Sequence, residues 1–275
     1  MGRMIAIDLD GTLLDDNLMV SQANIDSINE AIKDGFKIVI CTGRPYAGMK
    51  KFITEFCYSK HHPEYLILGN GTTIRTVNNL EAVHNKTVGK SVRQIALEVL
   101  NKYQNQGLSL AALNDFHFYG ITNNEVSNIL IEDAAKNEMK VEPMSVDDFL
   151  NHDQLNKLMF MAEPNVLNAL QEDIAREFIG QGDTVRSTPL IFEVLPKNIN
   201  KGSSLSLLAK HLNIDLKNTT VIGDAPNDIT MFEVAGKRVA MENAHESIRK
   251  LSDFITLSNN NSGVAAAILH ELEGK

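Results

Sequence analysis

Short apolar runs alternate with amphipathic stretches over the first part of the chain. Residues 3–9 and 36–40 have the length and continuous hydrophobicity of buried strands, and residues 65–68 form a third such run. Between the first two runs, Ser21 is a predicted N-cap for an amphipathic helix. Strands that alternate with helices in this way predict a parallel sheet with helices on both faces.

Turn signals refine this part of the pattern. Pro45 suits the first turn of a helix that is expected to continue to about Phe56. The pair Asn70-Gly71 follows the third strand and predicts a hairpin into a further strand. The same alternation returns near the C-terminus, with strands expected at 191–195 and 219–222 and helices at 201–212 and 227–235.

The middle of the chain follows another pattern, in which helices are followed by pairs of strand-like segments. This order favours an α+β insert with a mostly antiparallel sheet. The predicted fold is therefore α/β: a doubly wound, mostly parallel, Rossmann-like core formed by residues 1–84 and 191–275, with an inserted α+β cap domain at 85–190.

Composition and charge narrow the class of protein. The chain has 275 residues, of which 43% are hydrophobic and 22% charged, as in a globular protein with a sizeable core. A net charge of −9 argues against nucleic acid and anionic membranes as partners, because both need basic patches. No stretch is long and apolar enough to span a bilayer, and two cysteines are too few for a disulfide framework, so a cytoplasmic location is expected.

Four polar patches follow or adjoin the predicted core strands. They are Asp8-Leu9-Asp10-Gly11-Thr12, Thr42-Gly43-Arg44-Pro45, Asn200-Lys201-Gly202 and Gly223-Asp224-Ala225-Pro226-Asn227-Asp228. Open α/β sheets place ligand sites outside the carboxyl ends of their strands, so the four patches are expected to converge.

Each patch also has an ordinary structural explanation. Asp8 and Asp10 at the end of a strand can cap a loop, Thr42 can be a plain helix N-cap, and Lys201 can be a solvated surface lysine. The fourth patch can be an Asp-rich helix N-terminus. Against this, a lysine in a first helical turn conflicts with the helix dipole, and a bound phosphate removes the conflict. Hard oxygen ligands at the mouth of a buried strand suit Mg²⁺.

Taken together and in this order, the four motifs resemble those of the haloacid dehalogenase-like hydrolase superfamily. The flanking residues narrow the resemblance to its Cof-type phosphatases, which carry a large cap of C2 type between the second and third motifs. Those flanks include Asn70-Gly71, Glu193-Val194 and Met231. One mild departure is Ala225, which stands where Asn, Gln or Ser is more usual.

The resemblance implies a role for each motif residue. Asp8 is the implied nucleophile, which forms an aspartyl-phosphate, and Asp10 is the general acid and base. The cofactor is Mg²⁺, held by Asp8, Asp10, Asp224 and Asp228. The phosphoryl group is bound by Thr42, Gly43, Arg44, Lys201 and Asn227.

The implied reaction is hydrolysis of a small-molecule phosphoester, with sugar phosphates as the expected class and selectivity supplied by the cap. Arg186, Ser187 and Thr188 are candidates for that selectivity. A phosphosugar mutase uses the same aspartyl-phosphate and stays an alternative, as does a catalytically inactive phosphosugar-binding regulator. The chain is expected to be a monomer or homodimer.

Other reactive residues receive structural roles. Cys41 lacks a histidine partner nearby and is expected to be buried packing. His61 and His62 are expected to be solvated in a loop, and His117 and Tyr119 to lie on an ordinary sheet face.

Overall fold

A computed structural model describes residues 2–57, 64–122 and 125–273 and divides the chain into two compact units. Unit 1 contains residues 1–42, 51–84 and 200–275, and unit 2 contains residues 43–50 and 85–199. The predicted positions of His61 and His62 lie outside the described residues. Among the described residues, no helix is long and apolar enough to cross a membrane.

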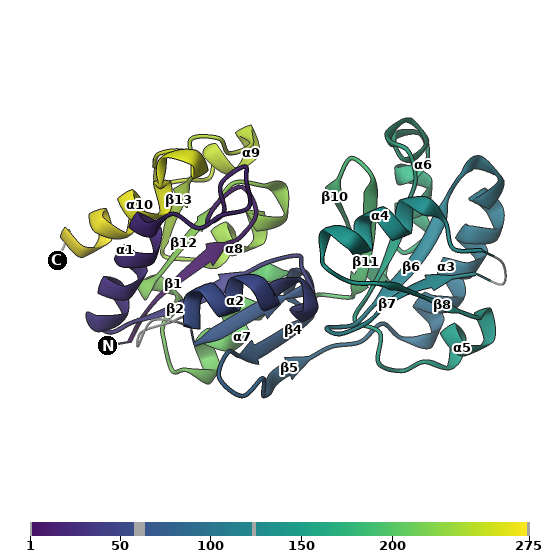
Figure 1. Cartoon of the computed structure of the whole chain (residues 1–275), viewed down its shortest axis with the longest axis horizontal. Coiled ribbons are helices and arrows are strands. Elements are labelled where there is room, and N and C mark those ends of the chain that lie inside the picture. Colours follow the sequence, from purple (N-terminus) through teal and green to yellow (C-terminus); the bar gives the residue numbers. More distant parts are fainter. Residues whose placement is uncertain (1, 58–63, 123–124, 274–275) are drawn as a thin grey trace. The chain divides into compact units, whose positions relative to one another are not determined.

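Unit 1 is built on a mostly parallel sheet (Figure 1). Its strands, in spatial order, are β14 (Phe254–Ile255), β13 (Lys237–Ala240), β12 (Thr219–Gly223), β1 (Arg3–Asp8), β2 (Phe36–Cys41), β3 (Tyr65–Leu68), β4 (Thr73–Thr76) and β5 (Ala82–Asn85). The strands from β14 to β3 run parallel, and β4 returns antiparallel to β3. The expected doubly wound α/β core is confirmed.

The helices of unit 1 lie between its strands in the sequence, except the last, which follows the final strand. They are α1 (Gln22–Lys33), α2 (Lys50–Cys57), α7 (Lys201–His211), α8 (Ile229–Val234), α9 (Glu246–Arg249) and α10 (Gly263–Glu273), with short 3₁₀ turns η2 (Gly69–Gly71), η4 (Leu216–Asn218), η5 (Pro226–Asp228) and η6 (Asn259–Asn261). The 3₁₀ turn η1 (Tyr46–Met49) lies in the segment 43–50, which groups with unit 2. Ser21 caps α1 as expected, because its side chain accepts the backbone N–H of Asn24. The helix expected from Pro45 instead begins as the turn η1 and becomes α-helical only at Lys50.

Unit 2 contains a six-stranded, mostly antiparallel sheet, as expected for an α+β insert. Its spatial order is β10 (Gly182–Thr188), β11 (Ile191–Pro196), β9 (Lys157–Met161), β6 (Ser109–Leu113), β7 (Phe118–Ile121) and β8 (Val141–Met144). Its helices are α3 (Lys90–Tyr103), α4 (Asn128–Lys136), α5 (Val146–Asn151) and α6 (Pro164–Glu177), with the turn η3 (Gln104–Gln106). The sequence pattern did not reveal α5.

The sheet of unit 2 has an apolar layer on each face. Along β9, Leu158 and Phe160 pack into a cluster with α3, α5 and α6, whereas Met159 and Met161 pack on the opposite face with α4. A strand buried on both faces has no polar alternation, so its sequence looks like that of a parallel core strand.

β11 is likewise buried on both faces, which explains one wrong expectation. Residues 191–195 were expected to lead back into the core, but β11 pairs antiparallel with β9 and β10 in the sheet of unit 2. The division between the two units lies at residues 199 and 200, not at 190 and 191. Residues 43–50 also group with unit 2, which no local pattern indicated.

The expected hairpin at Asn70-Gly71 brings a turn close to the start of α7. Gly71 has a φ of +108°, and a Cβ at this position would lie 2.3 Å from the backbone oxygen of Asn200. Its own carbonyl accepts the Ser204 hydroxyl at 2.6 Å. The turn therefore requires glycine for both its backbone conformation and its close contact with α7.

We expect Gly71→Ala to reduce the free energy of unfolding by about 2–4 kcal/mol, because strain at positive φ adds to a backbone clash. Gly35→Ala is the matched control, since Gly35 has a φ of +87° and nothing within 4 Å of the added Cβ. It should cost only about 1 kcal/mol. Urea unfolding of both variants measures the difference, and equal losses would show that the contact with Asn200 is unimportant.

Candidate active site

The ends of two neighbouring parallel strands place carboxylates at one edge of the unit 1 sheet. Asp8 is the last residue of β1, and Asp224 directly follows Gly223 at the end of β12. The two strands pair in register from Met4 with Thr219 to Ile7 with Ile222. Because parallel strands end at the same edge, this register brings the two carboxylates together.

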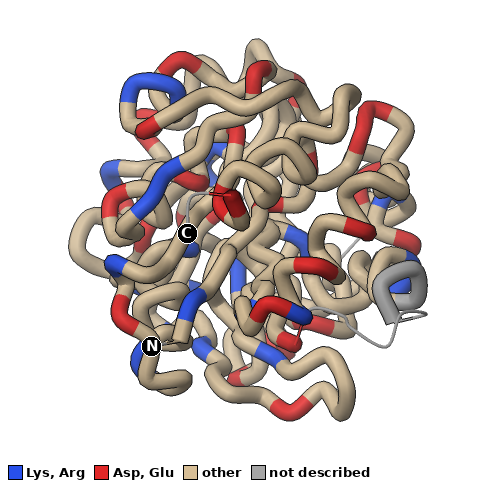
Figure 2. The backbone as a smooth tube through the Cα atoms, turned by 90° about the vertical axis from the view of Figure 1, so that its left-hand side faces the viewer, with Lys and Arg blue, Asp and Glu red and all other residues tan. Residues whose placement is uncertain are grey.

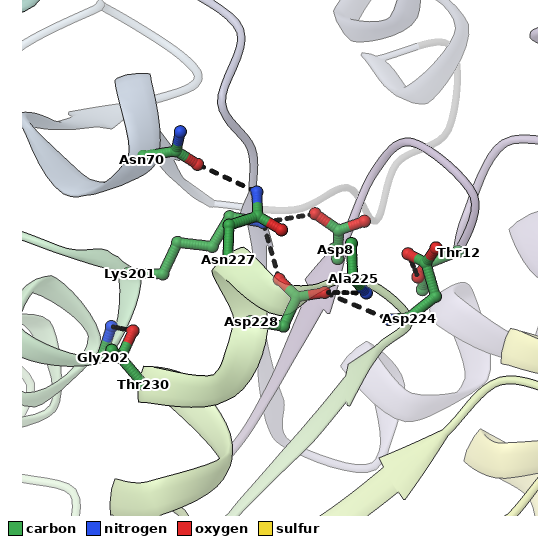
Figure 3. Close-up of polar contacts among 10 residues, drawn as sticks. All are labelled: Asp8, Thr12, Asn70, Lys201, Gly202, Asp224, Ala225, Asn227, Asp228 and Thr230. Atoms are coloured by element: carbon green, nitrogen blue, oxygen red, sulfur yellow. Dashed lines mark hydrogen bonds and ion pairs between the residues drawn. The ribbon is translucent and has the colours of Figure 1, made fainter. Parts of the chain in front are cut away.

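Lys201 lies at the first turn of α7 and is completely buried. Its Nζ donates to Asp8 Oδ1 at 2.5 Å and to Asp228 Oδ1 at 2.7 Å (Figure 3). The helix start is fixed by a capping box between Asn200 and Ser203. The lysine that conflicts with its helix dipole is thus stabilised by two carboxylates, which sequence reasoning had not identified as its partners.

Asp228 is also held from its other oxygen. Its Oδ2 accepts the backbone N–H groups of Asp224 at 3.1 Å and of Ala225 at 3.2 Å. The Thr12 hydroxyl donates to Asp224 Oδ1 at 2.9 Å. Asp8, Asp224 and Asp228 each offer a carboxylate oxygen, and these three oxygens lie within 4.8 Å of one another. The arrangement is a preformed cluster of hard oxygen ligands.

The electrostatics of the cluster follow from its burial. Burial, and then the carboxylate of Asp228, raise the pKa of Asp8 well above its usual value, although Lys201 opposes them. The same two causes raise the pKa of Asp224 to about 6. Burial alone would lower the pKa of Lys201, but Asp228 and Asp8 outweigh it and raise that pKa. Three carboxylates lie beside a single lysine, which pairs with Asp8 and Asp228, so the site favours additional positive charge.

The other predicted site residues of unit 1 lie in the same region. Thr42 follows Cys41, which is the register partner of Asp8. The Thr42 N–H donates to the Ile67 carbonyl, and the Thr42 carbonyl accepts the Asn70 N–H. Asn227 donates to the side chain of Asn70 at 3.1 Å (Figure 3). Asp10 is exposed and lies two residues beyond the end of β1.

Gly43 and Arg44 belong to the segment that groups with unit 2. Burial raises the pKa of Asp133 of α4, and Arg44 is one of the nearby cations that oppose this rise, after Lys157 and Lys136. The division of the chain into two units falls between Thr42 and Gly43.

Thr12 and Asn70 were not assigned roles from the sequence, although both lie in the quoted motifs. Their contacts join segments more than 150 residues apart, at separations of 212 and 157 residues. Their position within the motifs was the only feature of the sequence that could have indicated a role. The residues around a hydroxyl or an amide do not show which distant side chain it will bond.

Three further residues discussed from the sequence, Cys41, His117 and Arg186, make packing or hydrogen-bond contacts within their own units. Cys41 is buried as expected, and burial raises the pKa of its thiol. His117 stacks on Tyr119 with ring centroids 5.5 Å apart and contacts Glu142 at 2.8 Å. Arg186 Nε donates to the backbone oxygen of Thr188 at 2.7 Å, so it is tied to its own bulged strand.

Comparison with known proteins agrees with this geometry. A family model described as haloacid dehalogenase-like hydrolase matches residues 5–268. The chain belongs to the haloacid dehalogenase-like hydrolase family. The expected Cof-type, haloacid dehalogenase-like membership is thereby confirmed.

Relatives and solved structures match the chain along its whole length. YxeH of Bacillus subtilis is 31% identical over 277 residues, which cover 99% of this chain and 98% of that protein. The 5-amino-6-(5-phospho-D-ribitylamino)uracil phosphatase YcsE of Bacillus subtilis is 30% identical, with 98% and 95% covered. A haloacid dehalogenase-like hydrolase from Bacteroides thetaiotaomicron has a TM-score of 0.83 at 26% identity, with 98% and 100% covered. The family match and the phosphatase relatives together show that the chain is a phosphoric monoester hydrolase.

Proposed function

We propose that this haloacid dehalogenase-like phosphatase is Mg²⁺-dependent and hydrolyses phosphate esters of small sugars or polyols through a phosphorylated Asp8. The observation that carries the proposal is the cluster of Asp8, Asp224 and Asp228, whose carboxylate oxygens lie within 4.8 Å of one another, with Lys201 paired to Asp8 and Asp228. Unit 2 is proposed to be a cap of C2 type that selects the substrate.

The residues of the cluster fit a hard divalent cation. Carboxylate oxygens are the ligands that Mg²⁺ prefers, and Asp8, Asp224 and Asp228 would hold it together with the backbone carbonyl of Asp10. When bound, the ion neutralises charge on the phosphoryl group and on Asp8, which otherwise repel each other.

The chain's own residues then divide the reaction between them. Asp8 attacks phosphorus with a carboxylate oxygen, and the bond from phosphorus to the ester oxygen breaks. Asp10 donates a proton to the leaving alkoxide and later takes one from the water that hydrolyses the acyl phosphate. Lys201 stabilises the charge that develops on the phosphoryl oxygens, and Thr42, Gly43, Arg44 and Asn227 position them.

Two features support a small, anionic substrate. Acidic and basic residues are interspersed along the backbone (Figure 2), and the net charge is −9. Attraction of the phosphate therefore depends on local groups such as Lys201 rather than on a basic surface. The relative YcsE is named for a phosphorylated ribityl compound, which supports a phosphorylated polyol or sugar as the substrate class here.

The experiment that tests the proposal is phosphate release from an aryl phosphate and from a panel of sugar phosphates, with Mg²⁺ and with EDTA. Release that stops in EDTA and returns with Mg²⁺ supports the proposal. Sugar bisphosphate-dependent interconversion of phosphosugars without phosphate release would instead identify a mutase.

Metal binding is expected to depend on pH near the pKa of Asp224. That pKa is raised to about 6 from 3.8, so the metal-free folded state binds a proton more tightly than the unfolded chain. The stability that this group contributes is fully present below its unfolded pKa and is lost as pH rises through about 6. Mg²⁺ must displace that proton, so its apparent affinity should fall about tenfold per pH unit below about 6.

The measurement is the rise in Tm that Mg²⁺ produces at about pH 5 and at about pH 7.5. We expect a large rise at the higher pH and a small one at the lower. Asp224→Asn should show only a small rise at both values. An equal rise in the wild-type protein at both pH values would contradict a metal role for Asp224.

A further inference from the structure

A second buried lysine–carboxylate pair lies in unit 2. Lys157 of β9 donates from Nζ to Glu193 Oε1 of β11 at 2.9 Å, and the two side chains are only 5% and 4% exposed. Lys157 shares its face of the sheet with Met159 and Met161, and Glu193 shares it with Ile191. Replacing such a buried pair with apolar side chains often costs no stability, so stability alone does not account for it.

Lys157 has a second partner. Its Nζ also donates to the backbone oxygen of Gly43 at 2.9 Å. Gly43 directly follows Thr42, so the lysine bonds the turn that is proposed to bind phosphate. Glu193 in turn fixes the ammonium group, which leaves the lysine little freedom to release the carbonyl.

The rest of this segment is held by unit 2 as well. The Ala47 N–H donates to the backbone oxygen of Asp115 at 2.9 Å. The ring of Tyr46 lies edge-on to Phe116 with centroids 5.7 Å apart. The backbone from Gly43 to Ala47 is therefore tied to unit 2 along its length, and Lys157 makes the contact nearest to Thr42.

Peptide geometry gives this contact a chemical consequence. The Gly43 oxygen and the Arg44 N–H belong to one planar peptide unit and point in opposite directions. A cation that fixes the oxygen therefore also fixes the direction of that N–H. It also polarises the amide, because hydrogen bonds in sequence strengthen one another.

We propose that Lys157 and Glu193 are positioning residues for phosphate binding: Lys157 fixes the peptide between Gly43 and Arg44, and Glu193 fixes Lys157. This inference rests on the proposed function, in which the turn of Thr42, Gly43 and Arg44 holds the phosphoryl group. Neither side chain needs to touch the substrate.

The test compares Lys157→Met/Glu193→Leu with the wild-type protein. The Kd for orthophosphate is measured by calorimetry with Mg²⁺, and Tm and kcat/KM are measured in parallel. We expect a Tm near or above that of the wild type, because the buried charges are removed as a pair. Orthophosphate should bind at least about fivefold more weakly, and kcat/KM should fall about 10–100-fold because the turn is misplaced.

The matched control is Lys102→Met/Glu177→Leu, which removes an exposed pair of unit 2 with a 3.6 Å separation. It should leave the Kd and kcat/KM unchanged. If Lys157→Met/Glu193→Leu does not fold, Lys157→Arg replaces it. Arginine keeps a charge beside Glu193 but its planar fork cannot reproduce the ammonium contact, so orthophosphate should bind several-fold more weakly at a native Tm.

Wild-type affinity and turnover in either folded variant would overturn the positioning role. That result is distinct from failure of the proposed function, in which the wild-type protein itself releases no phosphate with Mg²⁺. Orthophosphate binding is measured without turnover, so the two failures are separable.

Discussion

Asp8→Asn is expected to lower kcat by at least about a thousandfold, because an amide cannot serve as the nucleophile towards phosphorus. The fold should be retained. Burial and Asp228 raise the pKa of Asp8, so its charged form is costly in the metal-free protein. Removing that charge should leave Tm at or above the wild-type value, measured without metal near neutral pH.

The control for this variant is Asp26→Asn, which removes an exposed carboxylate from α1. It should change neither kcat nor Tm appreciably. Turnover by Asp8→Asn within about tenfold of the wild type would refute the nucleophile assignment. A large fall in Tm would show that Asp8 stabilises the fold, and the lost activity would then need another explanation.

Lys201→Ala is expected to have two large effects. Loss of a buried cation that stabilises the phosphoryl group should lower kcat/KM by about 10²–10³-fold, which corresponds to ~3 kcal/mol. Asp8 and Asp228 also lose their shared partner, at 2.5 and 2.7 Å. Breaking a buried pair from one side costs about 3–5 kcal/mol, so the metal-free variant should unfold at a clearly lower Tm.

Mg²⁺ provides a way to separate these effects. The ion restores positive charge among the carboxylates, so it should recover much of the lost Tm but not the lost kcat/KM. Lys210→Ala, on an exposed position of the same helix, is the matched control and should behave as the wild type. A change in kcat/KM smaller than about threefold for Lys201→Ala would argue against its proposed role.

Much of the core was predictable because it is encoded locally. The apolar run that ends in Asp8 and the one that ends before Asp224 define neighbouring parallel strands, and the rule that ligands bind at their carboxyl ends brings the acids together. Lys201 was recognisable as unusual because a first helical turn disfavours a cation. In these places local pattern and tertiary role coincide.

The remainder depends on partners that local sequence does not specify. The contacts of Lys201 with Asp8 and Asp228 span 193 and 27 residues, and that of Lys157 with Gly43 spans 114. β11 was placed in the wrong sheet because an apolar strand buried on both faces looks the same in either sheet. The sheet to which β11 belongs depends on which strands pair with it, and the residues of β11 alone do not specify those partners.

The order of strands in the unit 1 sheet has a consequence for synthesis on the ribosome. β1 can pair with β2 early, but its other neighbour, β12, lies roughly 215 residues further along the chain. At translation rates of about 5–20 residues per second, β12 is synthesised about 10–40 seconds after β1, and until then the second edge of β1 has no partner strand. The six strands of the unit 2 sheet all emerge in that interval. The nascent chain therefore carries an apolar strand with one unpaired edge through most of its elongation, a period in which chaperone binding at β1 should be greatest.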